Sequence, residues 1–150
     1  MPLNAIRPTV TQLGNSLRVV TVPIEHAHRV VVDARVRVGP RFETARLNGL
    51  SHFLEHMLYR GTPTHPTAHE LALAFESLGG SLEAATYADH GSLVLSAPPE
   101  HLDPLIAVFA EIFQSPIYDG IGVERGIVRE EILECLDEEG RQVDADNLVR

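Results

Sequence analysis

The chain has no lysine and no tryptophan, and all twelve of its basic residues are arginines scattered along 150 residues. The formal net charge is -9. A protein that binds nucleic acid or an anionic membrane surface through electrostatics carries a dense basic patch, which this sequence lacks. We therefore expect neither nucleic acid nor a membrane among its partners.

Cysteine and long apolar runs are equally scarce. The single Cys135 excludes an internal disulfide, which is typical of proteins in a reducing compartment. Because apolar residues lie beside it, we expect Cys135 to be a small core residue. No apolar stretch is long enough to cross a bilayer, and residues 1–7 lack the apolar segment of a signal peptide. These features predict a soluble, cytoplasmic protein.

The sequence does have the composition of one globular unit. Hydrophobic residues make up 44% and charged residues 22% of it, and the length provides one core but not two ordinary domains. The chain stops at Arg150 without a closing element, so we expect residues 1–150 to be a single unit, truncated from a longer protein.

Apolar periodicity predicts an α+β fold in which an antiparallel sheet packs against helices. Alternating patterns and turn residues indicate strands at 9–13, 16–24, 29–39, 81–86 and 91–96. Helical spacing indicates four helices, which start near residues 48, 67, 98 and 121. Asn48 is the expected cap of the first helix. Tyr59 and Arg60, which follow that helix, are expected to serve in packing and capping.

The first expected helix carries His52, Glu55 and His56. Two histidines four positions apart share one face of a helix, and Glu55 lies on the same side. Two imidazoles at this spacing can bind one Zn²⁺ ion. A carboxylate next to a ligand histidine can take the proton of a water molecule that attacks a peptide bond. The order is the reverse of the H-E-x-x-H motif and predicts the same chemistry, a zinc site on a helix.

A catalytic zinc site also needs a third protein ligand and one open position. The acidic segment near the end of the chain offers candidate carboxylates. Glu124 and Glu131 are two helical turns apart and share a face, whereas Glu130 points about 100° away. Spacing alone favours Glu131 over Glu130 only slightly. Cys135 suits a structural zinc site better than a catalytic one.

The motif and its surroundings closely resemble the signature of the pitrilysin family of inverzincins, which includes insulin-degrading enzyme and the mitochondrial processing peptidases. The resemblance runs from Asn48 through the stretch from His52 to Thr62, HFLEHMLYRGT in one-letter code. It continues at residues 79–82. It returns at residues 123–132, where the family has a glutamate followed seven positions later by a zinc-binding glutamate. The resemblance covers essentially the whole chain.

The resemblance implies a role for each matching residue. His52, His56 and Glu131 would bind a Zn²⁺ ion, and Glu55 would be the general base. Glu124 would be a further carboxylate of the catalytic centre that orients a ligand histidine, an arrangement common around protein metal sites. Family subunits contain two related domains, so this chain would hold the metal site but only part of the first domain.

The same resemblance assigns residues 81–86 to a strand that lies along the active-site cleft and binds extended peptide by edge pairing. Where the family usually has asparagine, this chain has Glu83. That negative charge either shifts the substrate preference towards basic peptides or simply faces solvent.

The leading hypothesis is a zinc-dependent metalloendopeptidase that hydrolyses peptides or unfolded protein segments. The resemblance also implies a homodimer or a heterodimer with a related subunit. The alternative is a non-catalytic scaffold or assembly subunit of the same family, although relatives that lost activity typically have broken metal motifs. A third hypothesis is a structural zinc site, which requires a fourth protein ligand and no open position.

Overall fold

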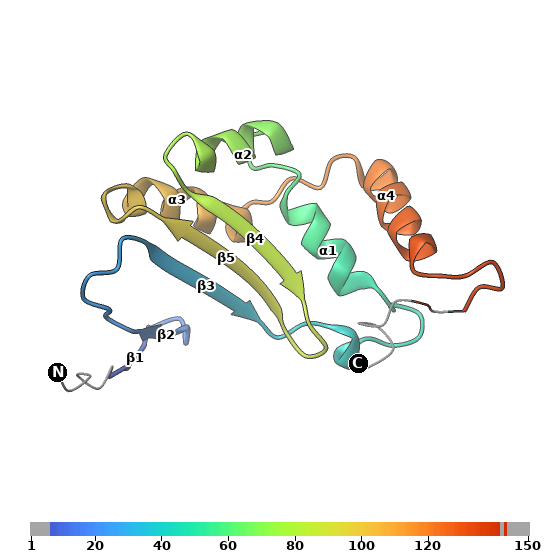
Figure 1. Cartoon of the computed structure of the whole chain (residues 1–150), viewed down its shortest axis with the longest axis horizontal. Coiled ribbons are helices and arrows are strands. Elements are labelled where there is room, and N and C mark those ends of the chain that lie inside the picture. The colour runs from blue at the N-terminus through green and yellow to red at the C-terminus, as the bar shows by residue number, and fades with distance from the viewer. Residues whose placement is uncertain (1–6, 142, 144–150) are drawn as a thin grey trace.

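The structure is a computed structural model, and it describes residues 7–141 and 143. Within the described residues, blocks of strands are followed by blocks of helices, in the α+β arrangement that the sequence predicts (Figure 1). The strands are β1 (Thr9–Gln12), β2 (Arg18–Thr21), β3 (Val30–Val36), β4 (Ser81–Thr86) and β5 (Gly91–Ala97). The α-helices are α1 (Leu50–Leu58), α2 (Ala68–Glu76), α3 (Leu102–Gln114) and α4 (Ile121–Glu134), and short 3-10 turns occur at Pro40–Phe42 and Pro99–His101.

The two N-terminal strands, β1 and β2, form an antiparallel hairpin. Its turn is closed by hydrogen bonds from the N–H of Leu13 to the carbonyl of Leu17 and from the N–H of Ser16 to the carbonyl of Leu13. Both strands were predicted, but β2 is shorter than the expected strand at 16–24. All residues of both strands are exposed. No packing against the core therefore stabilises a longer pairing between them.

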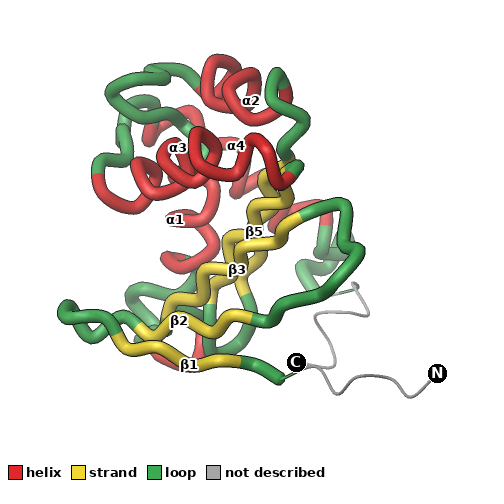
Figure 2. The backbone as a smooth tube through the Cα atoms, turned by 90° about the vertical axis from the view of Figure 1, so that its left-hand side faces the viewer, coloured by secondary structure: helices red, strands yellow, loops and turns green. Residues whose placement is uncertain are grey.

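The other three strands form an antiparallel sheet in the order β3-β5-β4, which makes β4 an edge strand. Successive side chains of a strand point to opposite faces of a sheet. Leu93, Leu95 and Ala97 of the central strand β5 are buried on the face that meets the helices. Figure 2 shows the helices gathered on one side of the sheet. The opposite face carries polar residues such as Asp33 and Ser92, and burial alternates along the first part of β3.

The core lies between the sheet and helices α2 and α3. Its buried members are Leu71, Phe75, Leu93, Leu95, Ala97, Leu105, Phe109 and Ile112. They recur at helical spacing in α2 and α3 and at alternate positions in β5, as the apolar patterns predict. In α1 only Met57 is fully buried, whereas Leu50 and Leu54 of the expected apolar stripe are 41% and 39% exposed. The metal motif therefore lies on a helix at the margin of the core.

The start of α1 differs from the expectation that Asn48 caps it. Gly49 is the cap residue, in the left-handed conformation with φ of 87°, and no side chain forms the usual cap bond. Instead the Glu43 carboxylate accepts hydrogen bonds from the backbone N–H groups of Gly49 and Ser51, at 2.7 and 2.6 Å. Burial alone would raise the pKa of Glu43, but hydrogen bonds from Ser51 and Gly49 outweigh it and lower the pKa. A carboxylate at this position satisfies free N–H groups of the first turn and interacts favourably with the helix dipole.

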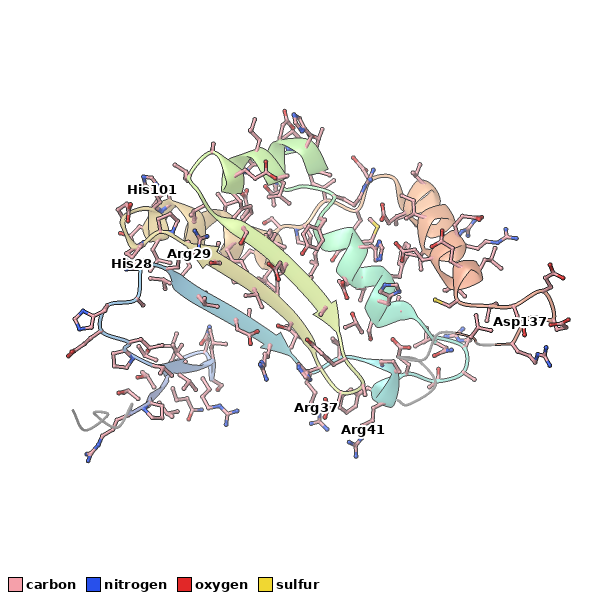
Figure 3. All side chains as sticks on the ribbon, viewed as in Figure 1. His28, Arg29, Arg37, Arg41, His101 and Asp137 are labelled. Carbon is pink, nitrogen blue, oxygen red and sulfur yellow. The ribbon has the colours of Figure 1, made fainter. Side chains whose placement is uncertain are left out.

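A polar cluster fixes the end of the sheet at which β4 begins. The Arg29 guanidinium donates to the hydroxyl and carbonyl oxygens of Ser96 and to the carbonyl of Gly79. His101 lies at the same end of the sheet, with Nδ1 3.0 Å from the carbonyl oxygen of Leu78 (Figure 3). The loop between α2 and β4 is therefore held from two sides, which positions the edge strand.

Helix α4 packs mainly against α1. Cys135 is the C-terminal cap residue of α4, is half-buried and does not belong to the core cluster, so the expectation of a core position is wrong. The reason is that the end of α4 lies away from the sheet. Among residues 7–141 and 143, none of the helices has the length and apolar character needed to cross a membrane.

Candidate metal centre

His52 and His56 lie one turn apart on α1 and point to the same place. Their Nε2 atoms are 3.1 Å apart, and their ring planes are nearly perpendicular, at 87°. The spacing of four residues predicted this shared face. The His56 side chain is 19% exposed and that of His52 is 40% exposed, so the pair is open to solvent on the His52 side.

Glu131 reaches the two histidines from α4. Its Oε2 atom lies 3.3 Å from Nε2 of His56 and 3.8 Å from Nε2 of His52. The buried Val128 precedes Glu131 by three residues and helps to turn this face of α4 inward. Glu130, the alternative that spacing left open, is exposed and is not part of the cluster. The structure therefore brings Glu131 to the histidines and leaves Glu130 outside.

The chemistry and spacing of these three side chains fit a zinc ion. Their donor atoms all lie within 4.8 Å of one another. With bond lengths of about 2.0–2.2 Å, donors at the corners of a tetrahedron around zinc are about 3.3–3.6 Å apart. The observed separations are 3.1, 3.3 and 3.8 Å. Two imidazole nitrogens and one carboxylate oxygen are also a donor set that zinc peptidases use.

Glu124 lies two turns before Glu131 on α4 and is buried. Its Oε1 atom is 3.0 Å from Nδ1 of His56. When the proton of the neutral imidazole is on Nδ1, His56 donates to Glu124 and its Nε2 atom keeps a free lone pair. Glu124 is therefore placed where it can orient the ring, which is the position that the resemblance implied.

Arg60 takes part in this arrangement, which the sequence analysis missed. It was expected to cap or pack at the end of α1, but its Nη1 atom lies 3.2 Å from Oε2 of Glu124. The two residues are 64 positions apart in the sequence, so no local pattern could have paired them. His56 and Arg60 thus occupy the two oxygens of one buried carboxylate.

Glu55 accepts a hydrogen bond from the hydroxyl of Thr86 at 2.5 Å. Thr86 is the last residue of β4, so this bond joins the edge strand to the metal-motif helix. Tyr59 lies one turn further along the chain. Its pKa is raised to about 12, mainly by burial and in addition by the charges of Glu55 and Glu83. Glu55 and Glu83 therefore place negative charge near the Tyr59 hydroxyl.

The edge strand β4 pairs with β5 alone among the described strands. Its outer backbone groups are therefore available to another extended chain. Glu83 is exposed and lies opposite Val94, on the face of the sheet away from the core. Its charge faces solvent beside any strand that pairs with β4.

A helix with the order H-x-x-E-H and a glutamate supplied by a second helix define the inverzincin class of metallopeptidase folds. Residues 18–150 match the insulinase family, peptidase family M16. The chain belongs to this family, which confirms the resemblance seen in the sequence.

Similar proteins share this region. An uncharacterized zinc protease of Mycobacterium tuberculosis is 35% identical over 133 residues, which are 87% of this chain and 30% of the relative. The beta subunit of the mitochondrial-processing peptidase of Dictyostelium discoideum is 30% identical over 118 residues, 77% of this chain and 24% of the relative. The crystal structure of a protease from Helicobacter pylori matches with a TM-score of 0.81 and 29% identity, over 88% of this chain and 32% of that one. The chain thus spans about a third or less of the length of these proteins.

Proposed function

We propose that this chain is the N-terminal, zinc-binding part of a metalloendopeptidase that cleaves peptides or unfolded protein segments. The observation that carries the proposal is the convergence of His52, His56 and Glu131 from two helices on one point. The names of relatives in the same family, which include zinc proteases, support zinc as the metal.

Each residue around the proposed zinc ion has its own role in the reaction. Zinc bound by the three ligands would act as a Lewis acid that polarises the scissile carbonyl and lowers the pKa of water. Glu55 takes the proton of the attacking water and passes it to the departing amine. Thr86 donates to Oε2 of Glu55, which orients the carboxylate. Glu124 holds the ring of His56 through Nδ1.

An extended peptide is the substrate that best suits the edge of β4. A peptide that adds to a sheet edge is held by its backbone, so its side chains need not follow one strict sequence. Because Thr86 ends β4 and contacts Glu55, a peptide paired along this strand passes beside the proposed base. Unfolded segments meet this requirement and folded domains do not.

The other two hypotheses are less well supported. A structural zinc site needs a fourth protein ligand, and in the described part of the chain only three side chains form the cluster. His52 and Glu131 are also 40% and 44% exposed, which suits a position open to substrate. A scaffold subunit has no need of a carboxylate such as Glu55 beside an intact ligand set.

Completion of the active site by further protein is part of the proposal. Because the chain spans about a third or less of its relatives, we infer that a further segment, a second copy or a related subunit supplies the rest of the cleft. The name of the Dictyostelium relative, a beta subunit, is consistent with a heterodimer. A cytoplasmic location also stays a prediction.

Zinc content of the purified 150-residue chain tests the ligand set. We expect about one zinc per chain, and we expect His52→Ala and Glu131→Ala to lose it because a catalytic site has only three protein ligands. Glu130→Ala is the matched control, since it removes the neighbouring carboxylate and should retain zinc. Retention of zinc by both ligand variants would contradict the assignment.

Glu55→Gln tests the role of the base. We expect the variant to bind zinc like the wild type and to lose peptide hydrolysis in the assembled enzyme, because an amide cannot accept the proton of water. Hydrolysis at the wild-type rate by zinc-loaded Glu55→Gln would reject Glu55 as the base. The scaffold hypothesis predicts instead that the assembled wild-type protein binds zinc without hydrolysing peptides.

A further inference from the structure

Glu124 is the one buried charged residue among those that the structure describes. A buried carboxylate is costly unless hydrogen bonds and an opposite charge compensate it. His56 uses Oε1 of Glu124, at 3.0 Å, but a neutral imidazole supplies no positive charge. The compensating charge comes from Arg60, whose Nη1 atom lies 3.2 Å from Oε2.

The Arg60 guanidinium lies against the start of α4. Gly120 caps this helix with a φ of 77°, and a Cβ atom at position 120 would lie 2.7 Å from Nη2 of Arg60. The Nε atom of Arg60 is buried and has no hydrogen-bond partner among the described residues. The recorded charged partner of the guanidinium is therefore the buried Glu124 carboxylate.

We propose that Arg60 is a positioning residue of the metal centre, which acts through Glu124 on His56. Its charge keeps the Glu124 carboxylate buried and turned towards Nδ1 of His56. That hydrogen bond holds the proton on Nδ1 and leaves Nε2 as the lone pair that faces His52 and Glu131. The inference rests on the proposed function only in taking zinc as the ligand of this site.

The alternative is that Arg60 merely ties α1 to α4. The two roles make different predictions for the metal-free protein. A purely structural contact between α1 and α4 contributes to the stability of the fold and leaves the tautomer of the His56 imidazole unchanged. A positioning residue sets the tautomer of His56 even before metal is bound, because it holds the Glu124 carboxylate as the acceptor at Nδ1, 3.0 Å away, in competition with Glu131, whose Oε2 atom lies 3.3 Å from Nε2.

Arg60→Met removes the charge and keeps much of the apolar stem. Arg125→Met is the matched control, because it removes the same charge from an exposed residue adjacent to Glu124. Arg60→Lys restores the charge without the planar guanidinium. For each purified chain we would measure the zinc dissociation constant by competition with a chromophoric chelator. We would also record the proton position on His56 in the metal-free protein by long-range ¹H–¹⁵N spectra.

We expect Arg60→Met to weaken zinc binding by about 10–100-fold, the range typical of residues that support a ligand histidine. In the metal-free chain the His56 proton should move from Nδ1 towards Nε2. Arg60→Lys should recover most of the affinity, and Arg125→Met should match the wild type in both measurements. Unchanged affinity and tautomer in a folded Arg60→Met chain would overturn the proposal.

Three further outcomes keep the test decisive. Loss of affinity with the proton still on Nδ1 would assign Arg60 the structural role instead. If Arg60→Met does not fold, Arg60→Gln retains a neutral donor and takes its place, and wild-type affinity and tautomer in that variant would overturn the proposal. If the wild-type chain binds no zinc, the proposed function fails at this site, whereas the tautomer measurement still tests Arg60.

Discussion

The hydroxyl of Thr86 donates a hydrogen bond to Oε2 of Glu55, which joins the last residue of β4 to the middle of α1. The two residues are 31 positions apart in the sequence, and both are half-buried. A hydrogen bond to a carboxylate is stronger than one between neutral groups. The contact therefore fixes the proposed peptide-binding edge relative to the proposed base.

Replacing Thr86 with valine removes this hydrogen bond and preserves the shape of the side chain. We expect the free energy of unfolding of Thr86→Val to fall by about 1–2 kcal/mol, because the charged acceptor loses its donor. Zinc affinity should not change, since Thr86 contacts none of the three ligands. Denaturant unfolding of the metal-free chain and zinc titration provide the two measurements.

Thr11→Val is the control for this comparison, because Thr11 is an exposed residue of β1. Its free energy of unfolding should stay within about 0.5 kcal/mol of the wild type, as for most surface substitutions. If Thr86→Val proves as mild as Thr11→Val, the hydrogen bond to Glu55 makes no net contribution to the fold.

Glu43 makes the stability of α1 depend on pH. In Glu43→Ala the N–H groups of Gly49 and Ser51 lose their acceptor, and we expect the free energy of unfolding at neutral pH to fall by about 1 kcal/mol, as for loss of a helix cap. Glu25→Ala, which removes an exposed loop carboxylate, is the control and should have little effect.

The direction of the pH effect follows from the lowered pKa of Glu43. The folded state binds this proton less readily than the unfolded state, whose ordinary pKa is 4.5. The stabilisation by Glu43 is therefore present above pH 4.5 and is lost as the pH falls through the lower pKa of the folded protein. Unfolding curves at several pH values should show the wild type and Glu43→Ala converging in acid. A difference that stays constant with pH would exclude the carboxylate as its source.

The parts of the site that could be predicted from the sequence are those that depend on local geometry. The shared face of His52 and His56 follows from helical spacing within one turn. The strand at 81–86 follows from the alternating pattern and the turn residues that flank it. Spacing alone favoured Glu131 over Glu130 as the third ligand only slightly. The packing of α4 on α1 decides which carboxylate reaches the histidines.

The contacts that escaped prediction join residues far apart in the sequence. Arg60 meets Glu124 across 64 positions, and the partner of Glu55 is supplied by a different strand. The prediction that Asn48 caps α1 failed for a related reason. Asn48 has the residue type of a cap, but the helix starts one position later with Gly49 as its cap residue, and the Glu43 carboxylate from the preceding loop accepts from the N–H groups of Gly49 and Ser51. Side-chain competition of this kind is decided by loop conformation.

Tyr59 provides a spectroscopic probe of the region between α1 and β4. Because burial and then the charges of Glu55 and Glu83 raise its pKa to about 12, a tyrosinate absorbance titration should contain a component near pH 12 that Tyr59→Phe removes. The folded state retains this proton where the unfolded state, with a pKa of 10, releases it. The stabilisation that protonated Tyr59 contributes to the folded state is complete below pH 10 and is lost as the pH rises through 12.

Glu83→Gln separates the two causes of this shift. We expect the pKa of Tyr59 to fall in this variant but to remain above 10, because burial is the larger cause. No change in the Tyr59 titration would show that the charge of Glu83 has no effect on the pKa of Tyr59. That result would also weaken any role for Glu83 in attracting basic residues to this part of the edge strand.

Two glycines of α4 should respond to alanine in opposite ways. Gly126 lies inside the helix, and a Cβ atom there meets nothing within 4 Å. We expect Gly126→Ala to raise the free energy of unfolding by about 0.5–1 kcal/mol, the difference in helix propensity between the two residues. Gly120 has a φ of 77°, and its Cβ atom would lie 2.7 Å from Nη2 of Arg60.

Gly120→Ala should therefore lower the free energy of unfolding by about 1–2 kcal/mol, the cost of the left-handed conformation for a residue with a Cβ atom. It should also weaken zinc binding, because the methyl group displaces the guanidinium that holds Glu124. Gly126→Ala leaves that contact intact and should bind zinc like the wild type. Unfolding curves and zinc titrations of the two variants check both expectations. Wild-type zinc affinity in Gly120→Ala would mean that the packing of Arg60 against the start of α4 has no influence on the metal ligands.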